Sequence, residues 1–317
     1  MRRTGYFLSV VLVILPLGAD EILDGKAGVK KVADGCKFTE GPAVSPAGEL
    51  FFSDIQNNRI MKLSGSGKAE EFRRPSGRAN GIVFDAQGRM VMCQGGGPGG
   101  GRRVARLEKD GSETVLAATY GGKKFIAPND LCIDGRGRTF FTDPYYGPPA
   151  VKSQPASGVY LIGVDGKVRL LLKDLLKPNG IALSPDGRHL YVSDRGTQKL
   201  HRYLVGKDGG LSERKIIYDF SPDRGIDGMC LDAMGNIYGA AGKGKTTGLF
   251  VISPEGKLLL HRPMPEFSTN VTFGGKAGRD LYLTASSSVY RMRALHPGIA
   301  WPARALRERA RETTGRD

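Results

Sequence analysis

The sequence of 317 residues is poor in the residues that build soft-metal and serine-hydrolase sites. Its four cysteines, Cys36, Cys93, Cys132 and Cys230, are spread along the chain without a Cys-x-x-Cys pair, which argues against a thiolate zinc site. The four histidines form no His-Glu-x-x-His pattern, and no Gly-x-Ser-x-Gly string occurs. Zinc hydrolysis and an α/β-hydrolase serine mechanism are therefore disfavoured. Cys132 and Cys230 lie in apolar segments, where we expect buried free thiols.

Long apolar runs are also scarce, and the one that exists lies at the N-terminus. An Arg-Arg pair precedes an apolar run over residues 6–17, which ends in a small Gly-Ala pair. This pattern is typical of a secretory signal peptide over residues 1–19, and the run is too short to span about 30 Å of hydrocarbon. We therefore expect a secreted or periplasmic mature protein without stable membrane insertion after cleavage.

The formal net charge is +15, but the chain has no basic run interleaved with aromatic residues. The positive charge is instead dispersed over the sequence, which is typical of a solvated surface. We therefore expect no nucleic-acid partner. A dispersed positive surface suits anionic partners such as cell-envelope material.

A pattern recurs six times along the chain. Each copy has an oxygen-bearing residue, a short apolar strand, a Gly-containing turn and a second strand rich in aromatic and β-branched residues. Most copies are followed by a further hairpin, as in GVYLIGVDGKVRLLL over residues 158–172. Four strands per copy predict an all-β protein, a six-bladed β-propeller with four-stranded antiparallel blades. The copies begin 40 to 50 residues apart, at Glu40, Asn80, Asn129, Asn179, Asp227 and Asn270.

The last copy supplies only three strands, the third of them within residues 287–293. The segment GVKKVAD, residues 28–34, can supply the missing outer strand, so we expect the N-terminal strand to close the last blade. The predicted propeller therefore spans residues 20–296. Residues 297–317 are predicted to form a basic C-terminal tail, as a short helix or a frayed end.

The six leading residues are predicted to converge, because the first strand of each propeller blade lines the central channel. Two of them, Glu40 and Asp227, are acids, and the other four are amides. This oxygen-only set suits a hard cation such as Ca²⁺ or Mg²⁺, and the flexible geometry favours Ca²⁺. The alternative is that these residues only cap strand ends. However, two acids in a shared mouth would repel each other without a counter-ion.

Five strings, TEGP, NDLCID, PNGIALSPDG, IDGMCLDAMGNIY and TNVTFGG, occur in this order along nearly the whole mature chain. In sequence and spacing they resemble the SMP-30/gluconolactonase/LRE family, also known as regucalcin-like. The resemblance implies a six-bladed propeller that hydrolyses sugar lactones or related esters with a divalent metal. The expected cofactor is Ca²⁺ or another divalent cation such as Mg²⁺, Zn²⁺ or Mn²⁺, and the expected partner is a small-molecule lactone.

The resemblance also implies roles for the matching residues. Asp227 would act as the catalytic base, or would orient a metal-acidified water, since a carboxylate that touches a cation is a weaker base. Asn129 would be a metal ligand or a substrate contact, and Asn80 and Asn270 are expected to be further substrate contacts. The implied metal ligands are Glu40, Asn129, Asn179 and Asp227.

Two departures from the family pattern leave the substrate open. Regucalcin-like members carry an arginine at the position of Ala127, and bacterial relatives carry Cys-Glu-His where this chain has Gln94 and a glycine-rich loop. We expect hydrolysis of a sugar lactone such as gluconolactone to the aldonic acid. An aryl or phosphoester hydrolase on the same site, or a non-catalytic propeller that binds protein or glycan, remain alternatives. Tyr145 and Tyr146 either pack on the surface or wall a sugar pocket.

The chain also contains a phosphate-binding motif without the structure that the motif requires. Residues 239–246, GAAGKGKT, match the phosphate-binding P-loop pattern. That loop requires a following helix, whereas a β-branched run follows here. We therefore expect a strand-to-strand loop at the rim of the propeller.

Overall fold

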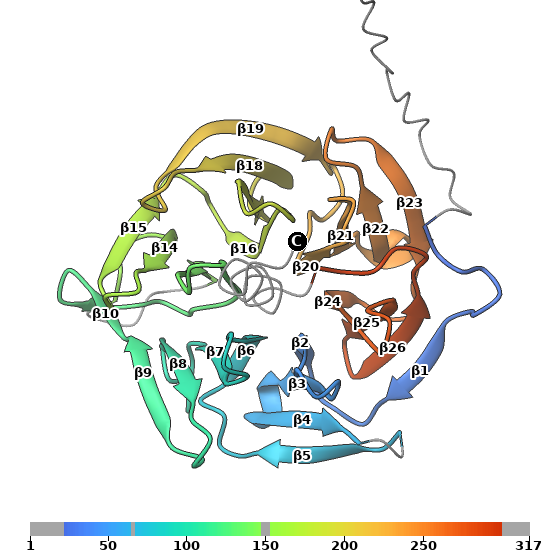
Figure 1. Ribbon diagram of the computed structural model, residues 1–317, viewed down its shortest axis with the longest axis horizontal. Coiled ribbons are helices and arrows are strands. Elements are labelled where there is room, and N and C mark those ends of the chain that lie inside the picture. The colour runs from blue at the N-terminus through green and yellow to red at the C-terminus, as the bar shows by residue number, and fades with distance from the viewer. Residues whose placement is uncertain (1–21, 65–66, 147–152, 300–317) are drawn as a thin grey trace, which may run out of the picture.

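The computed structural model describes residues 22–64, 67–146 and 153–299. Six four-stranded antiparallel sheets stand around a central axis in the order of the chain (Figure 1). This confirms the predicted all-β, six-bladed propeller. The predicted signal peptide and most of the predicted C-terminal tail lie outside the described residues. Within those residues, no helix is long and apolar enough to cross a membrane.

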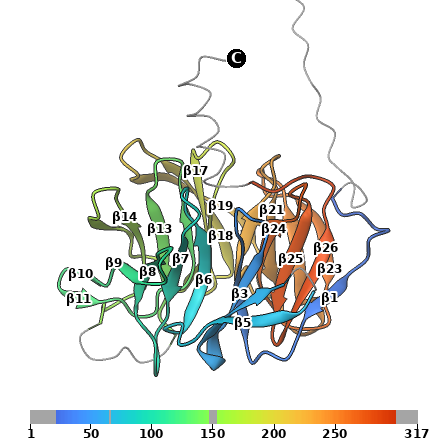
Figure 2. The same cartoon turned by 60° about the horizontal axis from the view of Figure 1, so that its bottom comes forward.

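The strands of each blade follow one another from the axis to the rim, and the innermost strands stand upright near the centre in Figure 2. Blade 1 contains β2 (Thr39–Val44), β3 (Leu50–Asp54), β4 (Arg59–Leu63) and β5 (Ala69–Arg73). Blade 2 contains β6 (Ala79–Phe84), β7 (Met90–Gln94), β8 (Arg103–Leu107) and β9 (Glu113–Ala117). Blade 3 contains β12 (Leu131–Ile133), β13 (Thr139–Asp143), β14 (Gly158–Ile162) and β15 (Val168–Leu172).

The second half of the ring is built in the same way. Blade 4 contains β16 (Pro178–Leu183), β17 (His189–Asp194), β18 (Lys199–Val205) and β19 (Leu211–Asp219). Blade 5 contains β20 (Met229–Leu231), β21 (Ile237–Ala241), β22 (Gly248–Ile252) and β23 (Leu258–Pro263). Blade 6 contains β24 (Ser268–Gly274), β25 (Asp280–Ala285), β26 (Ser288–Arg293) and, on its outer edge, β1 (Lys30–Ala33). A small hairpin, β10 (Thr119–Tyr120) and β11 (Lys123–Lys124), precedes blade 3.

The ring closes as predicted, because the N-terminal strand β1 pairs antiparallel with β26 (Figure 1). Glu266, in the loop before blade 6, fastens this closure. Its carboxylate accepts hydrogen bonds from Ser288 Oγ at 2.6 Å and the Tyr290 hydroxyl at 2.7 Å, and it pairs with Lys31 Nζ at 3.3 Å. Partial burial alone would raise the pKa of Glu266, but the hydrogen bonds from Ser288 and Tyr290 lower it to about 2.

The start of the predicted C-terminal tail runs along blade 5. Gly298 forms a β-bridge with Asp232, and Ile299 N donates to Leu231 O at 3.1 Å. These contacts lie at the hairpin turn that joins β20 to β21. Residues 297–299 therefore lie against the end of blade 5 on which the β20–β21 turn sits.

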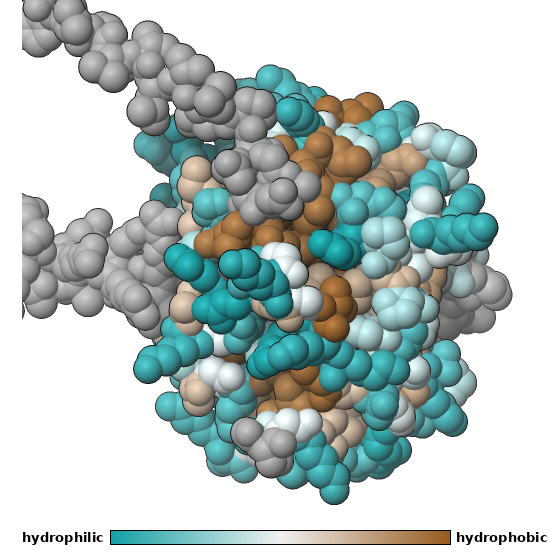
Figure 3. All heavy atoms as spheres, turned by 90° about the vertical axis from the view of Figure 1, so that its right-hand side faces the viewer, coloured by the Kyte–Doolittle hydropathy of each residue, from teal (hydrophilic) through white to brown (hydrophobic). Residues whose placement is uncertain are grey.

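The hydrophobic core is divided into six layers, one between each pair of neighbouring blades. Between blades 2 and 3, for example, the Phe125 ring packs at 5.0 Å from Phe141 and at 5.1 Å from Tyr160, centroid to centroid. Each blade thus buries both faces only when its neighbours are present. The outer wall by β23 and β1 is mostly hydrophilic with smaller hydrophobic areas (Figure 3).

Three acids that end the second strand of their blades have a structural role. The carboxylate of Asp54 accepts hydrogen bonds from the backbone of Lys37 and Phe38, which lead into blade 1. Asp143 and Asp194 bind the loops that lead into blades 3 and 4 in the same way. The recurring Ser-Asp or Thr-Asp pair therefore fixes the loops at one mouth of the channel.

Candidate functional site

The leading residues of the six copies meet at this same mouth of the channel because the neighbouring inner strands touch. A Cβ atom added to Gly180 would lie 2.5 Å from Asp227 O, and one added to Gly81 would lie 2.6 Å from Asp130 Oδ1. No real Cβ atom makes contacts this short, so the glycines permit the close approach of the strands. Glycine follows the leading residue in four copies, at Gly41, Gly81, Gly180 and Gly228.

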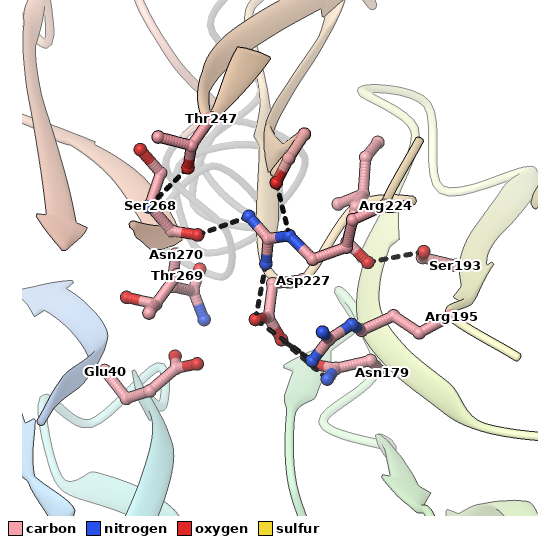
Figure 4. A network of polar contacts seen from close by, with 12 residues as sticks. Glu40, Asn179, Ser193, Arg195, Arg224, Asp227, Thr247, Ser268, Thr269 and Asn270 are labelled. Carbon is pink, nitrogen blue, oxygen red and sulfur yellow. Dashed lines mark hydrogen bonds and ion pairs between the residues drawn. The ribbon is translucent and has the colours of Figure 1, made fainter. Parts of the chain in front are cut away.

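Asp227, just before β20, is the centre of a network of polar contacts (Figure 4). Its Oδ1 accepts a hydrogen bond from Asn179 Nδ2 at 2.7 Å, and its Oδ2 accepts one from Arg224 Nη1 at 2.8 Å. Arg195 Nη1 lies farther away, 3.2 Å from Oδ2 and 3.4 Å from Oδ1. Asp227 and Asn179 are both buried. The carboxylate of Asp227 is therefore held in one orientation.

Arg224 is a buried cation that the sequence patterns did not indicate. Its Nε donates to Gly242 O at 2.7 Å and its Nη2 to Ser268 O at 2.6 Å, while the guanidinium lies 4.1 Å from the centroid of the Phe267 ring. No other copy of the repeat has an arginine three residues before its leading position. Arg224 could thus be assigned to the site only from the contacts between blades 5 and 6.

Glu40, on β2, points toward the same space as Asp227 (Figure 4). It is buried, and its Oε2 accepts a hydrogen bond from Gly41 N at 3.0 Å. Burial raises the pKa of Glu40 well above its ordinary value, and the negative charge of Asp227 raises it further. The mouth therefore combines two buried acids whose repulsion a cation between them would relieve.

Asp130 is a third buried acid in the channel, and it was not among the residues predicted from the sequence. Its Oδ1 accepts a hydrogen bond from Leu131 N at 2.9 Å. Burial raises the pKa of Asp130 to about 7; the bond from Leu131 N opposes this shift, and the charge of Asp227 adds to it. The signal was present in the sequence, since Asp130 occupies the position at which four other copies have glycine.

Asn270, on β24, lies between two of these acids. Its side-chain amide opposes the rise in the pKa of both Glu40 and Asp130, and its Oδ1 accepts a hydrogen bond from Val271 N at 2.8 Å. Asn270 was predicted as a substrate contact. In the structure its side chain is near enough to both Glu40 and Asp130 to affect their pKa values.

Asn80 and Asn129 lie at the corresponding positions of blades 2 and 3 and are half-buried. The backbone O of Asn80 accepts a hydrogen bond from Ser53 Oγ at 2.7 Å, and that of Asn129 accepts one from Gly81 N at 2.7 Å. These bonds fix the backbone of the ring. The predicted roles of the two amide side chains, as substrate contacts and for Asn129 also as a metal ligand, stay predictions.

Of the predicted metal ligands, Asn179 and Asp227 are in direct contact, and Glu40 points toward the same space (Figure 4). In the described part of the chain, no group of three or more His, Cys, Asp or Glu residues is placed to hold a metal ion. A cation here would therefore need the Asn179 amide oxygen in addition to the two carboxylates. Two carboxylates and an amide are the oxygen donors that Ca²⁺ and Mg²⁺ prefer, so the residues fit a hard cation. All four cysteines are free thiols, and none lies in this group. Cys132 and Cys230 were expected to be buried, but both are only half-buried.

A cavity of about 720 Å³ fills the other half of the channel. Asp130 and Asn270 line it, together with apolar residues of the inner strands such as Ile82, Leu131 and Met229. Glu40, Asn179 and Asp227 are not part of its lining. The candidate site is therefore at the opposite mouth, and Asp130 and Asn270 separate it from the cavity.

The fold and the site together define a β-propeller with buried acids and amides at one mouth of its channel. Within that class, the chain belongs to the SMP-30/gluconolactonase/LRE-like family, because residues 38–287 match the family model described as the SMP-30/Gluconolactonase/LRE-like region. The resemblance found in the sequence motifs is thus confirmed.

Three known proteins illustrate the relationship. A gluconolactonase from Zymomonas mobilis subsp. mobilis is 30% identical over 306 residues, which cover 86% of this chain and 83% of the relative. The solved structure of a gluconolactonase from Xanthomonas campestris is 29% identical, with a TM-score of 0.79, and the match covers 88% of this chain and 93% of that chain. A calcium-binding protein, regucalcin, from Agrobacterium tumefaciens has a TM-score of 0.70 at 17% identity, over 86% of this chain and 97% of that chain. At that identity the likeness shows the fold alone.

Proposed function

We propose that this protein hydrolyses a sugar lactone, such as gluconolactone, to the open-chain aldonic acid. The relatives from Zymomonas mobilis and Xanthomonas campestris, both named gluconolactonases, support this activity. The observation that carries the proposal is the convergence of Glu40, Asn179 and Asp227 at one mouth of the channel. Two acids that face each other in a buried site suit catalysis better than a purely structural role.

The proposed cofactor is one divalent cation held by Glu40, Asn179 and Asp227, with Asn129 as a further ligand. Ca²⁺ is the first candidate because the donors are all oxygens from separate blades, and Mg²⁺, Mn²⁺ and Zn²⁺ are alternatives. When bound, such a cation supplies Lewis acidity to the lactone carbonyl and to water.

The side chains position the reactants. Asp227 orients a water molecule toward the carbonyl carbon and accepts its proton. The water oxygen forms a bond to that carbon, and the bond from the carbon to the ring oxygen breaks. Asp227 then returns the proton to the ring oxygen, which becomes a hydroxyl group. Arg224 holds Asp227 in the orientation that this transfer needs. The amides of Asn80 and Asn129 are proposed to contact the sugar hydroxyls.

The decisive experiment is an assay of the purified protein against a panel of lactones, aryl esters and phosphoesters, in which acid release is followed with a pH indicator. We expect opening of gluconolactone, its loss after treatment with a chelator, and its recovery when Ca²⁺ is added. Cleavage of aryl esters or phosphoesters without lactone opening would instead favour the alternative hydrolase. No turnover and no binding of divalent ions would favour a non-catalytic propeller.

We also propose that the protein is exported to the periplasm or the medium, on the basis of the pattern over residues 1–19. Expression of the full chain followed by cell fractionation tests this. A chain that remains intact inside the cell would contradict the proposal.

A further inference from the structure

One side of the mouth carries Tyr146, Lys177 and Arg195, which we call the basic corner. Arg195 N donates to Lys177 O at 3.0 Å, and Lys177 Nζ lies 5.9 Å from the centroid of the Tyr146 ring. The Tyr146 hydroxyl accepts a hydrogen bond from Asn179 Nδ2 at 2.6 Å. The three residues therefore form one unit that adjoins the candidate site.

The two arginines near Asp227 differ in how many of their N–H donors remain available to a ligand. The side chain of Arg224 is 8% exposed, and all three guanidinium nitrogens donate to protein oxygens. The side chain of Arg195 is 24% exposed, and within the described residues its hydrogen bonds go to Asp227, at 3.2 and 3.4 Å, while the Tyr146 hydroxyl interacts with it electrostatically. A guanidinium has five N–H donors, so Arg195 retains donors that can face a ligand.

Positive charge in the corner is only partly compensated. Lys177 is exposed, and among the described residues it forms no ion pair. Asp227 is shared by two arginines, and the nearby Asp194 binds the backbone of Leu176 and Lys177. An exposed ammonium beside the Tyr146 ring and a partly free guanidinium beside Asp227 thus belong to one corner, and such cations bind carboxylate or phosphate groups.

We propose that the basic corner binds an anionic substituent of the substrate. The preferred substrate class is then a sugar lactone that carries a carboxylate or phosphate group away from its ring carbonyl. The Tyr146 ring, which is 48% exposed, offers a face against which the sugar can pack. This inference rests on the proposed lactone hydrolysis and adds the charge of the substrate to it.

The test compares kcat/KM for three lactones: neutral gluconolactone, a lactone with a terminal carboxylate and one with a terminal phosphate. For the wild type we expect at least one anionic lactone to exceed the neutral one by about 10-fold or more. Arg195→Gln is expected to lower kcat/KM for that anionic lactone about 10- to 100-fold, mainly through KM, and to lower it much less for the neutral one. Lys177→Met is expected to cause a smaller loss that disappears at high salt.

Arg136→Gln is the matched control, since it removes the same charge from the β12–β13 turn, where Arg136 Nη1 donates to Lys207 O. This variant should keep the wild-type preference. The larger of the two anionic preferences shows whether a carboxylate or a phosphate is recognised. Equal kcat/KM for neutral and anionic lactones in the wild type would overturn the inference while leaving lactone hydrolysis intact. An equal loss for all lactones in Arg195→Gln would also overturn it, because Arg195 would then serve only to hold Asp227.

A binding measurement covers the case in which no lactone is opened and the proposed function itself fails. Calorimetry with gluconate, glucarate and 6-phosphogluconate compares acids that differ only in the group at the far end. Tighter binding of glucarate or 6-phosphogluconate than of gluconate, lost in Arg195→Gln, would support the basic corner. Equal binding of all three, or an unchanged preference in Arg195→Gln, would overturn it.

Discussion

Replacement of Asp227 by asparagine separates its structural role from its chemical role. The change keeps the shape of the side chain but leaves Arg224 as a buried cation without a carboxylate partner. Both side chains are less than a tenth exposed, so the loss of the charge pair should cost about 3 kcal/mol of unfolding free energy. Lactone opening should fall by about 10³-fold or more, because the proton acceptor is lost.

The partner change Arg224→Met removes the cation and keeps an apolar side chain beside the Phe267 ring. In the double variant of Asp227→Asn and Arg224→Met, neither side chain carries a charge, so the cost of an unpaired buried cation disappears. Part of the lost stability should return, while the Gly242 and Ser268 carbonyls lose their donors. Urea denaturation at pH 7 measures the stability of all four proteins, and the lactone assay measures their activity. The double variant should be more stable than Asp227→Asn and still inactive. Recovery of activity in it would refute the reasoning, since Asp227 would then be needed only to neutralise Arg224.

Three further predictions follow from the same structure. Lys245→Ala, in the loop that matches a P-loop pattern, should leave lactone opening within a few-fold of the wild type, and a folded but inactive variant would mean that the site is misplaced. Glu266→Gln should lower the free energy of unfolding by about 1–2 kcal/mol near neutral pH. Folding lowers the pKa of Glu266 to about 2, so the wild type should be more stable than the variant above pH 4.5. In urea denaturation this difference should disappear as the pH falls toward 2. Gly228→Ala places a Cβ on the Asn270 side chain and should cost about 1–3 kcal/mol in the same measurement, whereas Gly25→Ala, with open space around it, should be neutral; equal effects would contradict the packing argument.

The fold could be predicted from the sequence because each blade repeats one pattern of strands and turns. Six copies were visible, and the missing strand of the last copy had one candidate, residues 28–34, which the structure pairs with β26. Residues 239–246 likewise join two strands as expected, although residues 239–241 are the end of β21 itself and only residues 242–246 belong to the connection to β22. Periodic hydrophobic patterns and turn residues are local properties of the chain, and this is why they could be read directly.

The candidate site was only partly predictable. Glu40, Asn179 and Asp227 share one phase of the repeat, so their convergence followed from the fold. Arg224 and Arg195 have no counterparts in the other copies, and their roles depend on contacts between blades. Asp130 stands where most copies carry glycine. This difference places a carboxylate in the channel, but that can be recognised only when the contacts between the inner strands are known. The sequence patterns therefore could not predict the contacts between residues far apart in the chain.

The most direct test of the proposed cation site is calorimetric titration of Ca²⁺ into chelator-treated protein, in which the wild type is compared with Glu40→Gln. We expect the wild type to bind one ion per chain and Glu40→Gln to lose that binding while its unfolding transition remains cooperative. Absence of binding in the wild type, or the same affinity in both proteins, would contradict the claim that Glu40 and Asp227 face each other in order to hold a cation.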